Sequence, residues 1–243
     1  MFSVVALNWK TCRLVSVRDP HALKVASKVV RNGGVVVYPT ETSYALGCNA
    51  LDAKAVRRIY KMKGRDRSKP LPVIVADEKM ALRFAVLTPQ ANALIRRFMP
   101  GPLTIAAKRK VAMPACGKAR TVAFRIPSSE FARKLSKKAG VPIVSTSANV
   151  SGGEQLYEIA HVFEQFSKSA DLIVDCGDLA RQPASTLVCL AAAPKILREG
   201  PIPARQVMDA LKTGRKTNAG KAKAKSARKR ARRKQKKRAV KRR

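Results

Sequence analysis

The sequence predicts an α/β protein in which helices flank a twisted, open, mixed sheet. Three observations predict this class. Short apolar runs of strand length recur along the chain, and amphipathic segments of helical period alternate with them. The third is a hydrophobic content of 46%, which is ample for a core in 243 residues.

Apolar runs bounded by turn residues predict the strands. In chain order these are Val35–Tyr38, Pro72–Val75, Leu103–Ala107, Thr121–Ile126, Pro142–Ser145, Leu172–Asp175, Ser185–Cys189 and Lys195–Leu197. The opening MFSVVALNW is interpreted as one more strand rather than a signal peptide, because it lacks a basic leader and Lys10 interrupts it. No apolar run approaches the roughly 20 residues of a spanning helix, so we expect no membrane contact.

Periodic segments with capping residues predict the helices. Asp52 is the expected N-cap of Ala53–Met62, and Thr88 that of Pro89–Phe98, with Pro89 in the first turn. Ser128 precedes the segment Ser129–Lys138. The other predicted helices are His21–Arg31, Glu78–Ala85, Glu158–Phe166 and Ala204–Leu211.

The charge is strongly positive and unevenly placed. The chain carries 51 Lys and Arg against 15 Asp and Glu, a formal charge of +36. Of the basic residues, 17 lie in 215–243, which contains no Asp or Glu. Residues 1–214 therefore hold the other 34 basic residues and all 15 acidic ones, a formal charge of +19. Such a field favours polyanions: nucleic acid, acidic membrane or phosphate-rich ligands. The low-complexity segment after Leu211 is expected to be a disordered basic tail.

The distribution of cysteine and histidine narrows the function. Five cysteines at positions 12, 48, 116, 176 and 189 form no CxxC pair, and His21 and His161 lie far apart. This pattern indicates neither a disulfide framework nor a zinc site, and it favours a reducing, cytoplasmic setting. The sequence contains no P-loop motif and no GxGxxG after a strand, so a nucleotide would have to bind in another way.

Two polar segments follow or precede predicted strands. A run of hydroxyl-bearing residues with one glutamate, from Thr40 to Tyr44, comes directly after the strand Val35–Tyr38. In KMKGRDRSKPL, Lys63 and Arg65 are two residues apart beside Gly64, and in an extended segment they can reach one anion. Taken alone, such a stretch is more often a solvated basic loop. A compact ammonium and a guanidinium fork together suit a polyphosphate.

Two further segments carry polar groups near strand ends. STSAN places Ser147 and Asn149 after the strand Pro142–Ser145, where small polar side chains can line a crevice or form an ordinary turn. In TVAFRIP, Arg125 should share one strand face with Thr121 and Ala123. An arginine in an apolar strand needs a partner, usually a carboxylate of the protein or of a ligand.

Taken together, seven collinear motifs resemble the YrdC/TsaC family of L-threonylcarbamoyladenylate synthases. They are YPTETSYALG, KGRDRSKPL, GPLT, TVAFRIP, STSAN, PASTLV and LREG, within residues 20–211. The resemblance implies a twisted α/β sheet with a deep basic cavity on its concave side. It also implies a catalytic domain over residues 1–211, followed by the tail at 212–243.

The resemblance assigns roles residue by residue. By this resemblance, Lys63 and Arg65 are the catalytic pair. Together with Ser147 and Asn149 they match the family's K-x-R and S-x-N set, which holds the ATP phosphates. We expect both cations to face the site rather than the core. Arg125 matches the arginine that grips the substrate carboxylate. The remaining assignments are Thr121 and Arg198 near ATP, and Thr40, Tyr44 and Ser145 near L-threonine. The chain departs from the family at Ile74, where many relatives have histidine, and near Gln155.

The family reaction joins L-threonine, bicarbonate and ATP, with Mg²⁺, into L-threonylcarbamoyl-AMP and pyrophosphate. The implied partners are tRNA or other RNA, contacted through the basic body and tail, and proteins that transfer the threonylcarbamoyl group to tRNA. One alternative is a non-enzymatic RNA-binding or ribosome-associated protein. Another is a carbamoyl-adenylate former like that of hydrogenase maturation proteins, but their acylphosphatase and zinc-finger-like segments are not seen in this sequence.

Overall fold

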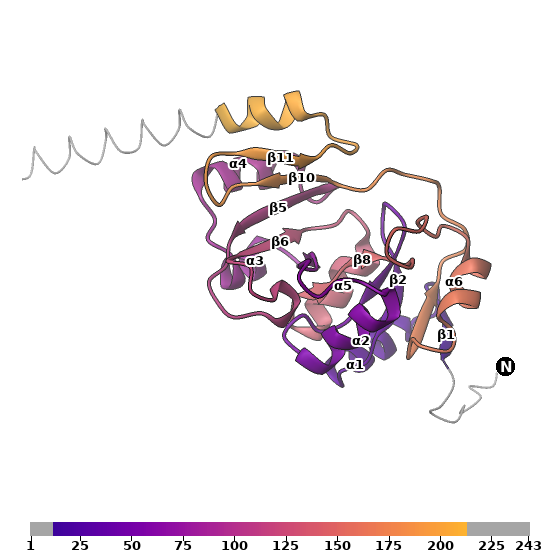
Figure 1. Ribbon diagram of the computed structural model, residues 1–243. Helices are drawn as coiled ribbons and strands as arrows, with labels where there is room; N and C mark the ends of the chain where they lie inside the picture. Colours follow the sequence, from indigo (N-terminus) through magenta and orange to yellow (C-terminus); the bar gives the residue numbers. More distant parts are fainter. Residues whose placement is uncertain (1–11, 213–243) are drawn as a thin grey trace, which may run out of the picture.

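A computed structural model describes residues 12–212 of the chain. The expected strand within residues 1–9 and the basic tail from residue 213 onward lie outside the described residues. The described part is a mixed α/β structure, as the sequence predicts, but its strands are divided between two sheets (Figure 1). Alternation of strands and helices along the chain does not encode this division.

The first sheet has five strands in the order β1-β9-β2-β3-β8. β9 pairs in parallel with both β1 and β2, whereas β3 pairs antiparallel with β2 and β8, so the sheet is mixed. The bounds are Arg13–Ser16 for β1, Val36–Pro39 for β2, Tyr44–Gly47 for β3, Thr146–Ser147 for β8 and Leu172–Asp175 for β9.

The second sheet has six strands in the order β11-β10-β5-β6-β4-β7. It is also mixed, because β10 runs parallel to β5 and β4 parallel to β6, while the other pairs are antiparallel. The bounds are Val73–Ile74 for β4, Leu103–Lys108 for β5, Thr121–Arg125 for β6, Ile143–Val144 for β7, Thr186–Cys189 for β10 and Lys195–Arg198 for β11.

The helices begin at the expected capping residues, with one shift. The Asp52 carboxylate accepts from the backbone N–H groups of Lys54 and Ala55, and Thr88 Oγ1 accepts from Ala91 N at 3.2 Å. For α5 the N-cap is Ser129, whose Oγ accepts from Ala132 N, and not Ser128. The helices are α1 Ala22–Arg31, α2 Ala53–Lys63, α3 Glu78–Phe84, α4 Pro89–Phe98, α5 Glu130–Ala139 and α6 Ile159–Phe166, with a short 3-10 turn at Pro114–Cys116.

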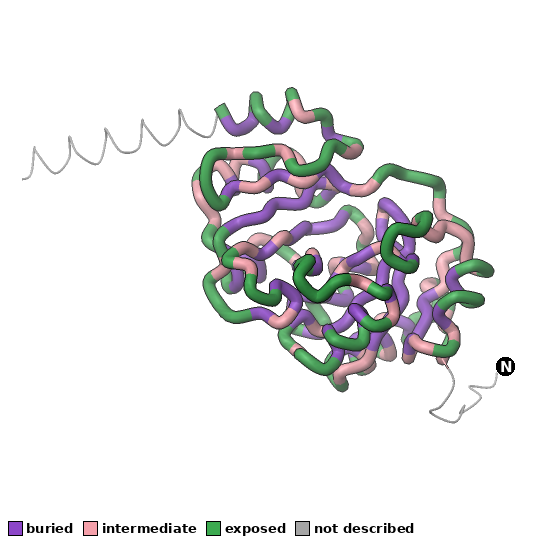
Figure 2. Tube along the Cα trace, viewed as in Figure 1, coloured by how far each residue is buried: buried purple, intermediate pink, exposed green. Residues whose placement is uncertain are grey.

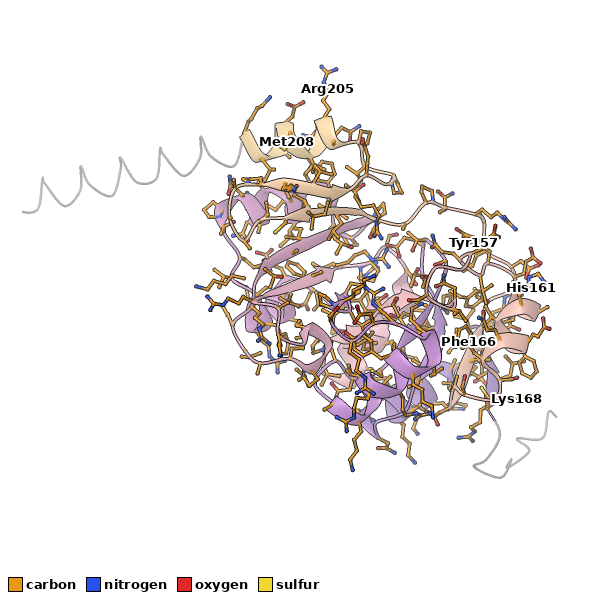
Figure 3. The ribbon with its side chains drawn as sticks, in the orientation of Figure 1. Tyr157, His161, Phe166, Lys168, Arg205 and Met208 are labelled. Carbon is orange, nitrogen blue, oxygen red and sulfur yellow. The ribbon has the colours of Figure 1, made fainter. Side chains whose placement is uncertain are left out.

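Residues 204–212 add a further helical segment, which lies beside β11 in Figure 1. Val207 and Leu211 are buried, whereas Arg205 points away from the body of the protein (Figure 3). This segment therefore covers the second sheet with an apolar face. In the part of the chain that the structure describes, no helix is both long and apolar enough to cross a membrane.

The inner strands β2, β3 and β9 of the first sheet are buried on both faces, which is why they are so apolar, whereas the edge strand β1 is mostly exposed (Figure 2). Val36 and Tyr38 pack in a cluster with residues of α1 and α5, while Val37, Tyr44 and others point into the larger core on the opposite face. Burying a large apolar side chain contributes roughly 1.5–3 kcal/mol.

The sequence analysis missed the strands β1, β3 and β8. For β3 the reason is visible in its pairing: Tyr44–Gly47 lies antiparallel to Val36–Pro39, so the apparent hydroxyl run divides into a loop, residues 40–43, and a buried strand. Gly47 is required here, because a Cβ atom would lie 2.5 Å from Tyr38 Cε1 and 2.9 Å from the Val144 carbonyl oxygen. The hairpin of β2 and β3 thus fixes the position of the loop 40–43.

Ser145 lies where the chain passes from one sheet to the other. β7 in the second sheet ends at Val144, and β8 in the first sheet begins at Thr146. The Ser145 N–H donates to the Pro72 carbonyl at 2.9 Å, and the Val144 N–H donates to the Cys48 carbonyl at 2.9 Å. This crossover brings residues of both sheets to one place.

Candidate active site

The loop 40–43 is built around the hydroxyl of Thr40. Its Oγ1 donates to the Ser43 carbonyl at 2.7 Å, lies 3.0 Å from Thr42 Oγ1, and accepts from the backbone N–H groups of Thr42 and Ser43. All three side chains are buried. Most of the hydroxyl run therefore fixes the shape of a tight loop.

Arg125 lies against this loop at the end of β6. It is only 7% exposed, and its Nη1 lies 3.2 Å from Glu41 Oε1 and 3.5 Å from Thr42 Oγ1. The partner that the strand pattern required is thus a carboxylate of the protein. Glu41 Oε2 accepts from the Ser129 N–H at 3.3 Å, while its buried Oε1 accepts no hydrogen bond from the described residues. That acceptor is held by charge alone.

Ser145 belongs to the same group. The Tyr38 hydroxyl lies within hydrogen-bonding reach of the Ser145 side chain and donates to the Val144 carbonyl at 3.3 Å. Burial raises the pKa of Tyr38, an effect that the Ser145 hydrogen bond and the nearby Arg125 charge oppose and that Glu41 reinforces. Ser145, Arg125 and Glu41 therefore all influence the pKa of one buried phenol, which the sequence analysis did not identify.

Lys63 is tied to the segment 147–149 by all three of its ammonium protons. Nζ donates to the Ser147 carbonyl at 2.6 Å, to the Asn149 carbonyl at 2.7 Å and to Asn149 Oδ1 at 2.9 Å. Burial lowers the pKa of Lys63 to about 8, and the charge of Arg65 acts in the same direction. The expected K-x-R and S-x-N grouping is thus assembled around this ammonium.

The burial of Lys63 corrects one expectation. At 2% exposure its side chain lies inside the protein rather than facing an open site. Burial is tolerated because every donor has an acceptor. The Ser147 hydroxyl in turn donates to Asn149 Oδ1 at 2.6 Å, and the Asn149 amide donates to the Gly153 carbonyl.

Arg65 is more accessible than Lys63 and is held by its own turn. Its Nε donates to the Lys69 carbonyl at 3.3 Å and its Nη2 to the Pro70 carbonyl at 3.2 Å. Gly64 ends α2 with a φ of +56°, a left-handed conformation that places Arg65 back beside the helix end. The guanidinium is therefore oriented before any ligand arrives.

One face of the second sheet carries a row of polar side chains. The register pairs Ile105 with Phe124, so Thr104 and Arg125, one residue further along each strand, share the opposite face. Leu187 pairs with both Thr104 and Arg198, which extends the row to β11. The row therefore runs across the sheet from Arg125 to Arg198.

A hydrogen-bonded chain fixes the far end of this row. Arg198 donates from Nε to the Ser185 carbonyl at 3.0 Å and from Nη2 to Ser185 Oγ at 3.3 Å, and Ser185 Oγ lies 2.8 Å from Thr104 Oγ1. Burial lowers the pKa of Arg198, and repulsion from the charge of Arg125 lowers it further. Thr104 and Ser185 stood in the motifs GPLT and PASTLV, but the sequence analysis gave them no role.

The middle of the same face is lined by small side chains. Ala106 pairs with Ala123, and Thr121 is partly exposed next to Ala123 along β6, as the alternation of TVAFRIP predicts. Ala106 and Ala123 lie two residues along their strands from Thr104 and Arg125, on the same face, and such small side chains fill little of the space over the sheet. Thr121 therefore lies at the edge of this polar face.

Tyr44 is the expected site residue that the structure directs elsewhere. Its hydroxyl accepts from the Cys176 N–H at 3.0 Å, donates to the Gly177 carbonyl at 2.7 Å and lies 3.2 Å from Cys176 Sγ. Its ring is fully buried in the larger core. Tyr44 thus ties β3 to the end of β9 and does not join the group around Arg125.

The arrangement combines fixed cations with neutral hydroxyl groups. Lys63, Arg65, Arg125 and Arg198 carry positive charge, and within residues 12–212 no cluster of three or more His, Cys, Asp or Glu side chains is placed to hold a metal ion. Such a set can bind carboxylates and phosphates and can neutralise charge that develops on them.

Comparison with known proteins identifies the family. The family model for Sua5/YciO/YrdC, described as "Telomere recombination", matches residues 28–200. Threonylcarbamoyl-AMP synthase of Pyrococcus abyssi is 36% identical over 189 residues, which cover 76% of this chain and 56% of that protein. The protein of the same name from Thiobacillus denitrificans is 38% identical over 173 residues, covering 70% of this chain and 90% of the relative.

A solved structure agrees with these relatives. The structure of P. abyssi Sua5 complexed with L-threonine matches with a TM-score of 0.76 and 34% identity, over 82% of this chain and 60% of that one. The chain thus spans less than two thirds of the Pyrococcus protein but nearly all of the Thiobacillus one. On the extent of the family match and the agreement in fold, the chain belongs to the Sua5/YciO/YrdC family.

Proposed function

We propose that the protein is an L-threonylcarbamoyladenylate synthase, which makes L-threonylcarbamoyl-AMP and pyrophosphate from L-threonine, bicarbonate and ATP. The observation that carries the proposal is its similarity to relatives named threonylcarbamoyl-AMP synthase, including one of nearly the same extent. The site supports it chemically, because its cations suit one amino-acid carboxylate and one polyphosphate.

The reaction uses the substrate's own nucleophile. The threonine amine forms an N–C bond to CO2 derived from bicarbonate and releases a proton to solvent. An oxygen of the resulting carbamate then bonds to the α-phosphorus of ATP, while the bond between that phosphorus and the bridging oxygen breaks and pyrophosphate leaves. A Ser/His/Asp triad is not needed, so binding and charge neutralisation carry the catalysis.

In this proposal Arg125 binds the threonine carboxylate. Its Nε and Nη2 donate no hydrogen bond within the described residues, so they can receive a carboxylate while Nη1 remains beside Glu41. Ser145 and the loop shaped by Thr40 would border the amino acid. Tyr44 supports this region only through the position of β3.

In the same proposal, the remaining cations bind the phosphates of ATP and the adenylate. Arg65 is oriented and partly exposed, whereas Lys63 would first have to exchange a carbonyl of segment 147–149 for a phosphate oxygen. Thr121 and Arg198 would contact ATP from the sheet face, together with Ser147 and Asn149. Mg²⁺ would arrive with ATP and offset phosphate charge, since the described residues form no carboxylate cluster to hold it.

The wider setting belongs to the same proposal. The adenylate would pass in the cytoplasm to proteins that transfer the threonylcarbamoyl group to tRNA, and tRNA or other RNA would contact the basic body and tail. The catalytic domain would span residues 1–211, with residues 212–243 as a separate tail. A purely RNA-binding role is not favoured, because the relatives at 36% and 38% identity carry the names of enzymes.

Pyrophosphate release by the full chain tests the activity. With MgATP, release should require both L-threonine and bicarbonate, and mass spectrometry should detect threonylcarbamoyl-AMP. L-Serine and reactions without bicarbonate are the controls. Equal ATP cleavage with serine, or with no amino acid, would exclude the proposed reaction.

A further inference from the structure

Among residues 12–212, Arg125 is the only cation of the candidate active site that forms an ion pair. Its Nη1 lies 3.2 Å from Glu41 Oε1, and the side chains of both residues are largely buried. The other three cations, Lys63, Arg65 and Arg198, donate only to backbone carbonyls and to neutral side chains of the described residues. The Arg125 end of the site is therefore close to neutral, whereas the rest of the site is cationic.

The two acidic residues that directly follow site cations in the sequence are engaged elsewhere. Asp66 accepts from the hydroxyl of Ser68 at 2.7 Å and from its N–H at 2.8 Å. Glu199 Oε1 accepts from the Ala204 N–H at 2.8 Å. Both acidic residues are exposed. Since water and salt screen exposed charges, neither neutralises a site cation in the way that Glu41 does.

Glu41 is held against Arg125 by the surrounding structure. It belongs to the tight loop 40–43, and its Oε2 accepts from the Ser129 N–H at 3.3 Å. Ser129 is the N-cap of α5, and the positive end of a helix dipole attracts a carboxylate. The buried Oε1 accepts no hydrogen bond from the described residues, so its interaction with Arg125 is one of opposite charges. The loop and the helix thus keep a negative charge beside this guanidinium.

We propose that Glu41 determines specificity, because it reserves Arg125 for the carboxylate of a zwitterionic amino acid and excludes the phosphates of ATP and pyrophosphate. This inference rests on the proposed function, to which it adds how the site distinguishes a carboxylate from a phosphate. A neutral ion pair can accept a zwitterion, since the ammonium group of the ligand offsets the charge of its carboxylate. A polyphosphate would instead bring several uncompensated negative charges beside a buried carboxylate.

The repulsion is large enough to decide between the two ligands. Two like unit charges about 6 Å apart in a partly buried site weaken binding by a factor of roughly 100. Without Glu41, Arg125 would bind phosphate as readily as carboxylate, because the fork of a guanidinium matches both groups. Pyrophosphate, or the phosphates of ATP, could then occupy the position of the amino acid.

Competition between ligands tests the proposal without requiring turnover. Binding of L-threonine to the full chain is measured by isothermal titration calorimetry, alone and with saturating inorganic pyrophosphate and Mg²⁺, at constant ionic strength. For the wild type, pyrophosphate should change the threonine Kd by less than about twofold, because the two ligands bind to different cations.

The variant Glu41→Gln removes the charge with little change of shape. Pyrophosphate should now compete at Arg125, so that it raises the threonine Kd by at least about tenfold. Glu41→Asp keeps the charge and should restore independent binding of the two ligands. The matched control is Glu130→Gln, which removes the same charge from an exposed side chain in the first turn of α5, where its partner is Lys134. This control should behave like the wild type.

Several results would overturn the proposal. They are displacement of threonine from the wild type by pyrophosphate, independent binding of both ligands to Glu41→Gln, loss of all threonine binding in that variant, and equal competition in Glu130→Gln. The first is measured on the wild type, so it decides even if circular dichroism shows that Glu41→Gln is unfolded.

A separate assay of pyrophosphate release distinguishes this inference from the proposed function. A chain that binds the two ligands as expected but makes no threonylcarbamoyl-AMP would disprove the enzymatic activity alone. An active chain in which pyrophosphate displaces threonine would disprove the role of Glu41 alone. Absence of threonine binding by the wild type would overturn both.

Discussion

Replacing Lys63 by methionine should destabilise the protein and disable phosphate binding at the same time. The substitution keeps the aliphatic stem but removes the donors to the Ser147 carbonyl, the Asn149 carbonyl and Asn149 Oδ1. Two of these acceptors keep another donor: the Asn149 N–H for the Ser147 carbonyl and Ser147 Oγ for Oδ1. Only the Asn149 carbonyl would lose its protein partner entirely.

The expected loss of unfolding free energy in Lys63→Met is the difference between two opposing contributions. Three hydrogen bonds to a charged group are worth about 1.5–3 kcal/mol each, or about 5–9 kcal/mol together. Relief from burying the ammonium offsets about 3 kcal/mol, the size implied by lowering the Lys63 pKa from 10.5 to about 8 at about 1.4 kcal/mol per unit. Since two acceptors keep a donor, the net loss of unfolding free energy should lie near the lower end, about 3 kcal/mol.

Urea unfolding and thermal melting measure this loss. A change of about 3 kcal/mol corresponds to a decrease in Tm of roughly 6–12 °C for a domain of this size. The control Lys61→Met, on the exposed side of the same helix, should change stability by less than about 0.5 kcal/mol. If Lys63→Met is as stable as the wild type, the ammonium does not hold segment 147–149, and the structural account of its burial is wrong.

The remaining predictions concern pH, substrate recognition and the tail. A lysine is charged below its pKa, so kcat/KM for ATP should fall as pH rises through about 8. In an active Lys63→Arg variant this decline should disappear, because a guanidinium stays charged. If the decline is unchanged in that variant, another group causes it. Arg125→Leu should raise the threonine KM far more than the ATP KM, and Arg125→Lys should restore binding only in part, because an ammonium lacks the fork; equal effects on both KM values would argue against a carboxylate contact. A chain ending at Gly214 should keep pyrophosphate release but show a shallower salt dependence of RNA binding than the full chain, since it lacks 17 positive charges; equal slopes would show that the tail makes no phosphate contacts.

Local sequence signals predicted the helices well because capping is a local event. Asp52 and Thr88 cap where expected, since each side chain bonds to backbone groups two or three residues away. The shift from Ser128 to Ser129 shows the limit of that argument, because adjacent serines offer the same hydroxyl. The choice depends on the Pro39 carbonyl, which accepts from Ser129 Oγ at 3.2 Å from a distant part of the chain.

Pairing across the fold was harder to predict than local structure. β8 has only two residues, and it exists because Leu46 and Ala45 of β3 lie beside Thr146 and Ser147. The contacts of Tyr44 with Cys176 and Gly177 were not predicted for the same reason, since its position in β3 decides which face its ring takes, and its role near L-threonine stays a prediction. The strand face of Arg125, which it shares with Thr121 and Ala123, was predicted correctly, because alternation within one strand does not depend on the partner strands.

The ion pair between Arg125 and Glu41 answers a question that the sequence left open. The strand pattern required a carboxylate near Arg125 but did not say whether the protein or a ligand supplies it. Glu41 supplies one, yet it engages only Nη1, and the edge formed by Nε and Nη2 has no protein acceptor among residues 12–212. A guanidinium binds a carboxylate best through two parallel hydrogen bonds. Glu41 therefore orients Arg125 and leaves the bidentate edge available to a second carboxylate. A carboxylate of the protein and one of a ligand, the two partners that the strand pattern allowed, are thus compatible with each other.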